Sequence, residues 1–318
     1  MKSSNRAELE GFLNVSKPWG WTSHDVVQLV RRLTGIRRVG HAGTLDPAAA
    51  GVLVVAVGRA TRLVDFAADH DKSYCGDVVL GAATNTDDAE GSVLYARDPS
   101  SVTLDQVVAA LSGFLGEIEQ LPPQFSAVKV KGRKAYEIAR RGGAAELAPR
   151  RVNIKGIAVV GWERPVVSVL VRCSKGTYIR SLARDLGEKL GVGGHLGALV
   201  RLASGPFTCD DSVGVEDLRM AAEFGYLDRL IWPPDVAVAH LPALIVSAEH
   251  ACDMRRGARW SMLSARPSRA ERGVEPRPSP LGPEGGQVRV YSVGGEFLGL
   301  AEPRDGAWQP RLVVSEGE

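Results

Sequence analysis

The sequence contains few cysteines and no apolar run long enough to form a membrane helix. The four cysteines in 318 residues, at positions 75, 173, 209 and 252, are widely spaced, and no Cys-x-x-Cys occurs. This argues against a disulfide framework and against a zinc site. Residues 1–11 are polar and charged and show no apolar signal segment. We therefore expect a soluble, cytoplasmic protein that binds no metal and no membrane.

The chain also lacks a strong net charge, so charge alone points to no class of partner. Its formal net charge is +2 and its pI is about 8.4, and only a local clustering of charge can then indicate a nucleic acid. The length predicts two domains, which we place at 1–240 and 241–318 around the prolines of Trp232-Pro233-Pro234 and Leu241-Pro242. Residues 265–286 hold five prolines, four glycines and four arginines, a composition that predicts a mobile loop.

One short loop presents a single carboxylate. In Gly40-His41-Ala42-Gly43-Thr44-Leu45-Asp46-Pro47, glycines flank a histidine, and Pro47 favours an extended Asp46. The apolar run 51–58 that follows predicts a buried strand. Taken alone, Asp-Pro and glycine are more typical of a plain turn than of a catalytic loop. Before the loop, Thr22 or Ser23 can begin a helix that Gly35 ends.

A second stretch combines cations, prolines and an aromatic residue between positions 121 and 142. Six cations and Tyr136 lie here: Lys129, Lys131, Arg133, Lys134, Arg140 and Arg141. Charge runs are usually solvated faces, but this mixture favours a surface that follows a nucleic-acid backbone. Four arginines of 31–38 could likewise approach phosphates or simply complement a helix end.

A strand and a helix flank the third candidate segment. Alternating valines at 167–171 predict a strand with a core face, and Thr177 is expected to cap the helix that follows Ser174-Lys175-Gly176. Tyr178 and Arg180 then lie near a strand end, a usual place for functional groups. Upstream, Tyr74 is expected to precede a strand at 78–83.

Two apparent motifs fail on spacing. Residues 84–91 resemble a calcium loop, but Ala89 and Glu90 stand where a ligand and glycine belong, so we interpret the segment as an acidic turn. Residues 191–197 resemble a dinucleotide fingerprint, but they follow a helix and the third glycine is misplaced. They are expected to end a helix before a strand near 199–202.

Taken together and in this order, these segments resemble the bacterial tRNA pseudouridine(55) synthases. The likeness covers segments 11–26, 40–47, 71–74, 123–142 and 173–207. It implies an α+β fold, with a mixed, largely antiparallel sheet in the catalytic domain and a small PUA-like β-barrel at the C-terminus. It also implies a monomer that isomerises uridine 55 in the T-arm of tRNA by base flipping, without a cofactor, and that can also assist tRNA folding.

The resemblance assigns roles to individual residues. Asp46 corresponds to the essential carboxylate, Tyr74 to the active-site tyrosine and Arg180 to the partner of the aspartate. The remaining residues expected to contact the substrate are His41, Tyr178, Leu199, Lys17, Lys129 and Arg201. Stacking of the extruded base on His41 or Tyr74 contributes about 1–3 kcal/mol.

Two rival functions remain open from the sequence. One is the guide-RNA-dependent pseudouridine synthase of archaea and eukaryotes, which segment 123–142 disfavours. The other is an RNA-binding folding chaperone, which the same basic surface would serve without any catalytic group. Retention of Asp46, Tyr74 and Arg180 favours the enzyme.

Overall fold

A computed structural model describes residues 9–130, 132–262 and 286–315. The loop expected at 265–286 lies, except for its last residue, outside the described residues, as does Lys131.

The larger part of the described chain is built on one mixed sheet of nine strands, in the order β1-β3-β12-β4-β11-β10-β7, with β2 beside β3 and β13 beside β12. Every neighbouring pair is antiparallel except β12 with β3. The mixed, largely antiparallel sheet predicted from the sequence is therefore confirmed. Its strands are β1 (Gly11–Lys17), β2 (Val39–His41), β3 (Ala49–Val57), β4 (Lys72–Leu80), β7 (Gly116–Gln120), β10 (Arg150–Glu163), β11 (Val166–Cys173), β12 (Gly194–Ser204) and β13 (Phe207–Thr208).

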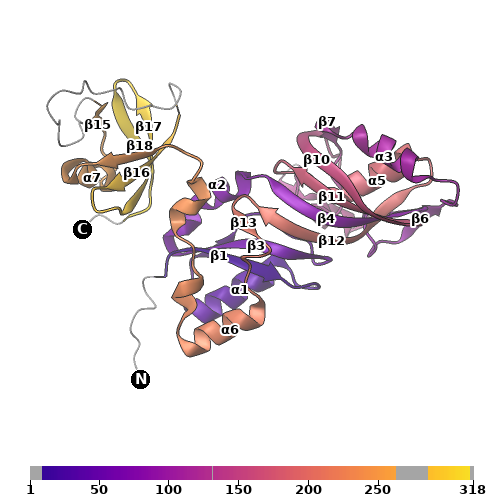
Figure 1. Cartoon of the computed structure of the whole chain (residues 1–318), viewed down its shortest axis with the longest axis horizontal. Helices are drawn as coiled ribbons and strands as arrows, with labels where there is room; N and C mark the ends of the chain where they lie inside the picture. The colour runs from indigo at the N-terminus through magenta and orange to yellow at the C-terminus, as the bar shows by residue number, and fades with distance from the viewer. Residues whose placement is uncertain (1–8, 131, 263–285, 316–318) are drawn as a thin grey trace.

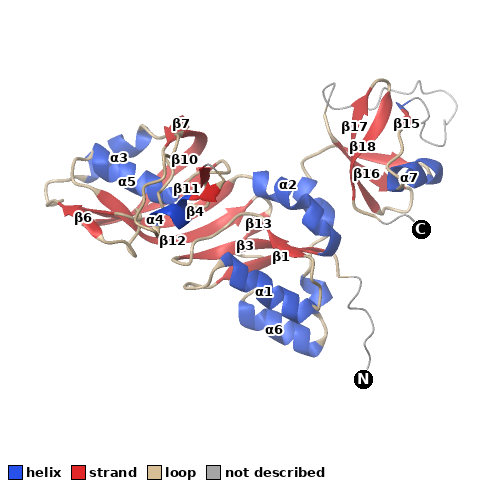
Figure 2. Ribbon diagram, turned by 180° about the vertical axis from the view of Figure 1, so that it is seen from behind, coloured by secondary structure: helices blue, strands red, loops and turns tan. Residues whose placement is uncertain are grey.

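Helices cover both faces of this sheet, which explains why β3 is apolar at nearly every position. Leu53, Val55 and Val57 pack with buried residues of α1 and α6, whereas Val52, Val54 and Ala56 belong to the cluster on the opposite face. Figure 2 shows α1 and α6 on one side of β1 and β3 and α2 on the other. The helices are α1 (Ser23–Thr34), α2 (Val64–Asp69), α3 (Leu104–Ser112), α4 (Ala135–Ala139), α5 (Ile179–Lys189) and α6 (Val215–Phe224), with 3-10 turns η2 (Gly58–Leu63), η3 (Leu227–Leu230) and η4 (Pro234–Val238).

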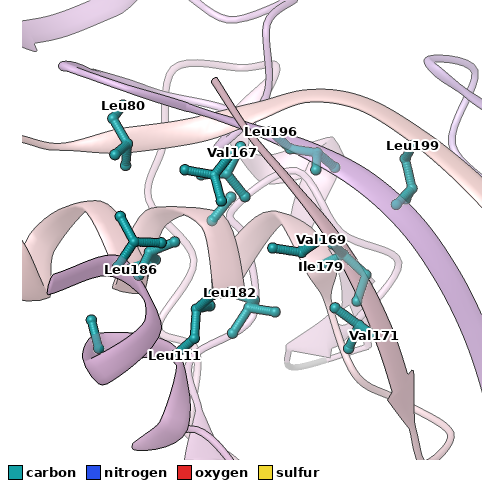
Figure 3. Packing of buried hydrophobic residues seen from close by; sticks show 14 of the residues in the cluster. Leu80, Leu111, Val167, Val169, Val171, Ile179, Leu182, Leu186, Leu196 and Leu199 are labelled. Atoms are coloured by element: carbon teal, nitrogen blue, oxygen red, sulfur yellow. The ribbon is translucent and has the colours of Figure 1, made fainter. Parts of the chain in front are cut away.

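The core nearest to the functional residues lies between α5, α3 and the sheet. In Figure 3, Ile179, Leu182 and Leu186 of α5 face the alternating valines of β11 and two leucines of β12. Val167, Val169 and Val171 are at most 2% exposed, as the period-two pattern predicted. This packing fixes the start of α5 against β12.

Two short hairpins project from this part of the chain. One joins β5 (Ala82–Thr84) to β6 (Val93–Ala96), and the other joins β8 (Lys129–Val130) to β9 (Arg133–Lys134).

A second sheet lies at one end of the molecule, beyond α2 (Figure 1). Its five strands follow the order β14-β16-β17-β18-β15, with α7 (Ala248–Arg255) packed on it. The strands are β14 (Ala243–Val246), β15 (Trp260–Ser261), β16 (Val288–Ser292), β17 (Phe297–Arg304) and β18 (Ala307–Val313). The predicted hairpin through Gly294-Gly295 is the β16–β17 pair. The PUA-like assignment and the boundary at 240/241 stay predictions.

Several local expectations can be compared with these elements. Thr22 begins α1 through a capping box with Asp25, and Gly35 ends it at φ 76°. The prediction that Thr177 caps α5 is wrong: the helix begins after Tyr178, and the Thr177 hydroxyl donates to the Ser174 carbonyl at 3.0 Å. Tyr74 does not precede a strand either, because β4 already begins at Lys72.

Candidate active site

The loop that carries Asp46 is held rigidly by backbone and side-chain hydrogen bonds. Gly43 adopts φ 108°, a region that favours glycine. The buried Ser23 hydroxyl of α1 accepts from the Leu45 N–H at 2.9 Å and donates to the Leu45 carbonyl at 3.0 Å. Leu45 is therefore anchored inside, while the neighbouring Asp46 side chain remains 45% exposed. The loop presents one carboxylate on a fixed backbone.

Arg180 is the direct partner of that carboxylate. Its Nη2 lies 2.8 Å from Asp46 Oδ2, and its Nη1 lies 3.4 Å from Asp88 Oδ2. It also donates to the carbonyls of Thr86 and Phe125, both at 3.1 Å. With only 7% of its side chain exposed, Arg180 has little freedom to leave this arrangement. The ion pair expected from the sequence is present.

A cavity of about 290 Å³ opens beside Asp46. This is near the lower end of the volumes that bind small molecules, about 300–1,000 Å³. Its wall is formed by residues from the Asp46 loop, β4, the 126–127 segment, the start of α5 and β12. Among the predicted site residues, it includes Asp46, Tyr74, Tyr178, Arg180, Leu199 and Arg201.

Sheet register explains why residues far apart in sequence share this wall. Arg201 lies directly opposite Tyr74 in the β12–β4 pair, and Leu199 lies opposite Gly76 two residues away on the same face. Parallel pairing places Leu199 opposite Ala49, the first residue of β3, three positions after Asp46. This pairing places Asp46 close to the middle of β12. Leu199 belongs at once to the core and to the cavity wall.

Both tyrosines of the cavity are protonated phenols near neutral pH. Burial raises the pKa of Tyr74, with a smaller opposing effect from the Arg201 guanidinium that contacts its hydroxyl. Burial also raises the pKa of Tyr178, and the nearby Ser126 side chain opposes the rise. Each can therefore donate a hydrogen bond to a ligand or stack against it. Tyr178 is positioned by Gln120, whose side-chain amide bonds both its backbone N–H and its carbonyl.

Arg201 is buried, and its guanidinium group is bound to backbone carbonyls. It is 1% exposed, and its Nε donates to the Val52 carbonyl at 2.6 Å. Its two terminal nitrogens donate to the carbonyls of Gly43 and Thr44, at 3.1 and 3.4 Å. The side chain thus stabilises the Asp46 loop through its backbone carbonyls and also forms part of the cavity wall. Because Arg201 lines the cavity, its expected contact with the substrate stays a prediction.

The other three predicted contacts lie away from the cavity. His41 is the last residue of β2 and is half-buried. Its burial lowers the pKa of the ring, the positive charge of Arg201 adds a smaller effect in the same direction, and the ring is therefore neutral at pH 7. Lys17 is 0% exposed and donates to the carbonyls of Pro18 and Trp21, at 3.0 and 2.6 Å, so it supports that turn, and its contact with the substrate stays a prediction. Lys129 is exposed on β8.

Sequence reasoning missed the acidic and basic groups that surround Arg180. The turn 84–91 was expected to be a plain acidic turn, yet Asp87 and Asp88 are both only 9% exposed. Asp88 shares Arg180 with Asp46, and Asp87 pairs with Arg184 at 2.8 Å, one turn further along α5. The adjacent Asp87 and Asp88, and the spacing of Arg180 and Arg184 by four residues, are visible in the sequence. The pairing between these two groups, more than 90 residues apart, could not be predicted from it.

Two properties of the described residues bear on cofactors and membranes. No group of three or more His, Cys, Asp or Glu side chains within them could hold a metal ion. No helix in the same part of the chain combines the length and apolarity needed to cross a bilayer.

Comparison with known proteins places this site in a family. Residues 31–179 match the TruB family pseudouridylate synthase N-terminal domain, and residues 180–239 match the tRNA pseudouridylate synthase B C-terminal domain. The tRNA pseudouridine synthase B of Thermobifida fusca is 44% identical over 314 residues, covering 96% of this chain and 99% of that protein. The protein of the same name from a Synechococcus species is 42% identical over 310 residues, covering 96% and 98%.

A solved structure of a Cbf5-Nop10-Gar1 complex matches at 26% identity with a TM-score of 0.70, covering 96% of this chain and 85% of that one. The sequence matches extend across the Asp46 loop, the cavity and α5. The chain belongs to the TruB family of pseudouridylate synthases.

Proposed function

We propose that this protein converts one uridine of tRNA, at position 55 in the T-loop, into pseudouridine. The observation that carries the proposal is the Asp46–Arg180 ion pair of 2.8 Å at the wall of a nucleoside-sized cavity. Relatives at 42–44% identity bear the name tRNA pseudouridine synthase B, which supports tRNA as the substrate. The family likeness supports the T-loop position.

The reaction is an isomerisation in which the base leaves N1 and returns through C5. The target uridine must leave its stack to enter the cavity, since an enclosed site cannot reach a base inside a helix. Leu199 and Tyr74 supply apolar and planar surface for the base. Arg180 holds Asp46 in place through the ion pair of 2.8 Å. We consider three uses of this carboxylate: attack on the sugar, addition to the base, and removal of a ribose proton.

The tRNA body would be held by the basic surface outside the cavity. Lys134 Nζ and Arg140 lie over the Tyr136 ring at 5.5 and 5.4 Å, which keeps cations and an aromatic together next to the β8–β9 hairpin. This mixture suits a flexible, phosphate-rich ligand. The same surface would suffice for a folding chaperone, and assistance to tRNA folding is compatible with catalysis. The cytoplasmic location and monomeric state stay predictions.

The test is incubation of an unmodified tRNA transcript with the protein, followed by mapping of pseudouridine at single-nucleotide resolution. We expect stoichiometric conversion at position 55 and none in a transcript that carries cytidine there. Conversion at another position would refute the T-loop assignment. An RNA that is refolded but unmodified would favour the chaperone.

A further inference from the structure

Besides Arg180, three buried cations lie around the active-site loop. Lys17, Lys72 and Arg201 are 0%, 6% and 1% exposed. None of them forms an ion pair with a described carboxylate, and each is held by backbone carbonyls instead. Lys72 Nζ donates to the carbonyls of Ala68 and His70, the latter at 2.6 Å. Buried charges are normally paired with an opposite charge, so this cluster is unusual.

Two of the three cations belong to the cavity wall. Lys72 and Arg201 both line the cavity, and Tyr74 lies between them. Lys72 and Tyr74 are two residues apart on β4 and therefore point to the same face of the sheet. Arg201 stands opposite Tyr74 on the neighbouring strand. The cavity wall thus carries two positive charges and a phenol from neighbouring strand positions, and the Asp46–Arg180 pair lines the same cavity.

Both cations retain hydrogen-bonding capacity for a ligand. A lysine ammonium has three donors, and Lys72 uses two on carbonyls. Arg201 has five N–H groups, of which three are committed to carbonyls and one contacts the Tyr74 hydroxyl. In a buried wall, such unneutralised donors favour a negatively charged occupant much more than they would in water.

The reaction assigned under Proposed function creates such an occupant, and the present inference rests on that assignment. When the N1–C1′ bond breaks heterolytically, its electron pair stays on the base, which becomes a uracil anion delocalised over N1, O2 and O4. The ribose carbon takes an electron pair from the Asp46 carboxylate or is neutralised by loss of a ribose proton. The C5–C1′ bond then forms as the Asp46 carboxylate leaves C1′, or as the lost ribose proton is returned to the sugar. C5 finally loses its proton, and N1 gains one.

We propose that Lys72 and Arg201 form an anion subsite that stabilises the detached uracil anion. Lys72 acts on the base as an electrostatic catalytic residue, and Arg201 acts both directly and by orienting the Tyr74 hydroxyl. The tRNA is recognised elsewhere, so this subsite serves the reaction rather than the binding. No described carboxylate forms an ion pair with Lys72 or Arg201, so their positive charge stays near the cavity.

The decisive variants separate the charge of Lys72 from its hydrogen bonds. Lys72→Gln keeps a donor for the carbonyls but loses the charge, whereas Lys72→Arg keeps the charge. In single-turnover assays with saturating enzyme, we expect Lys72→Gln to lose about 10²–10³-fold in rate, the usual effect of removing one stabilising donor from a developing anion. Lys72→Arg should recover most of the rate. Affinity for tRNA should change far less than the rate in both.

A matched control is available on α5. Lys189 Nζ also donates to a backbone carbonyl, that of Ala110, but it lies outside the cavity. Lys189→Gln should leave the single-turnover rate within about threefold of wild type. Circular dichroism and urea unfolding of all variants establish that each is folded. Equal rate losses for Lys72→Gln and Lys72→Arg would overturn the proposal, because the charge would then not matter.

The pH dependence of the wild-type rate gives a second test, which does not depend on whether a substituted protein still folds. Burial lowers the pKa of Lys72 to about 8, with Arg201 of β12 lowering it further and Cys173, Asp69 and Asp71 opposing this. Burial raises the Cys173 pKa to about 11, so the thiol is neutral near pH 8 and the opposing charges there are those of Asp69 and Asp71. The wild-type rate should fall as pH rises through about 8, where Lys72 loses its proton.

Lys72→Arg should remove this decline, because arginine stays charged. A decline that persists unchanged in Lys72→Arg would contradict the proposal and point to Lys17, whose pKa is also lowered to about 8. A wild-type protein that makes no pseudouridine at all would instead refute the underlying function.

Discussion

Arg180 holds two carboxylates at once, and its removal should affect stability and catalysis through different partners. In Arg180→Met, Asp88 would remain buried without a cation, since its side chain is only 12% exposed. Breaking a buried pair in this way costs about 3–5 kcal/mol. Asp46 is 45% exposed and can be solvated, so its lost pair contributes less than about 1 kcal/mol. Most of the lost stability should therefore come from Asp88.

The double variant Arg180→Met/Asp88→Asn tests this partition. Neutralising Asp88 should restore most of the stability, apart from about 1 kcal/mol for each of the two carbonyls that lose their donor. Activity should not return, because Asp46 still lacks the group that orients it, and misplacement of a catalytic group costs about 10²-fold or more. Urea unfolding and single-turnover pseudouridine formation measure the two effects. Equal stability of the single and double variants would refute the reasoning.

Three further predictions concern the RNA surface, a buried lysine and a close backbone contact. Neutralising Lys129 and Arg133 should weaken tRNA binding and reduce the slope of log affinity against log salt by about 0.7–0.9 per lost phosphate contact, and an unchanged slope would identify a solvated face. Because burial lowers the pKa of Lys17 to about 8, the folded state binds fewer protons than the unfolded state between about 8 and 10.5; wild-type stability should rise over this range relative to Lys17→Met, as urea titrations at several pH values would show. Gly51→Ala should destabilise by at least about 1–3 kcal/mol, since φ is +96° and the new Cβ would lie 2.3 Å from the Arg201 carbonyl oxygen; unfolding like wild type would contradict this.

The sequence predicted those parts of the fold that depend on local pattern. Alternating valines identified β11, and the glycine-bounded apolar run identified β3, because burial on one or both faces leaves a direct trace in the sequence. The start of α5 was misplaced at Thr177, since a good capping residue says nothing about whether its hydroxyl is used elsewhere.

The sequence predicted the site correctly where a residue type usually plays a single role in such a motif. Asp46 and Arg180 were assigned correctly as partners through the family resemblance. The resemblance also assigned Lys17 and Arg201 to the substrate. Both are buried and donate to backbone carbonyls, and of the two only Arg201 lines the cavity. Burial of a long cation depends on strand register and on loops distant in sequence, and neither is visible in a local pattern.

The central claim is that Asp46 performs the chemistry while other groups hold the RNA. Asp46→Asn keeps the shape and most hydrogen bonds of the side chain but removes its charge and nucleophilicity. Measured together, single-turnover pseudouridine formation at saturating enzyme and filter binding of the same tRNA should show a rate lower by many orders of magnitude with affinity unchanged or slightly higher. Substantial product from Asp46→Asn, or a loss of binding equal to the loss of rate, would contradict the account.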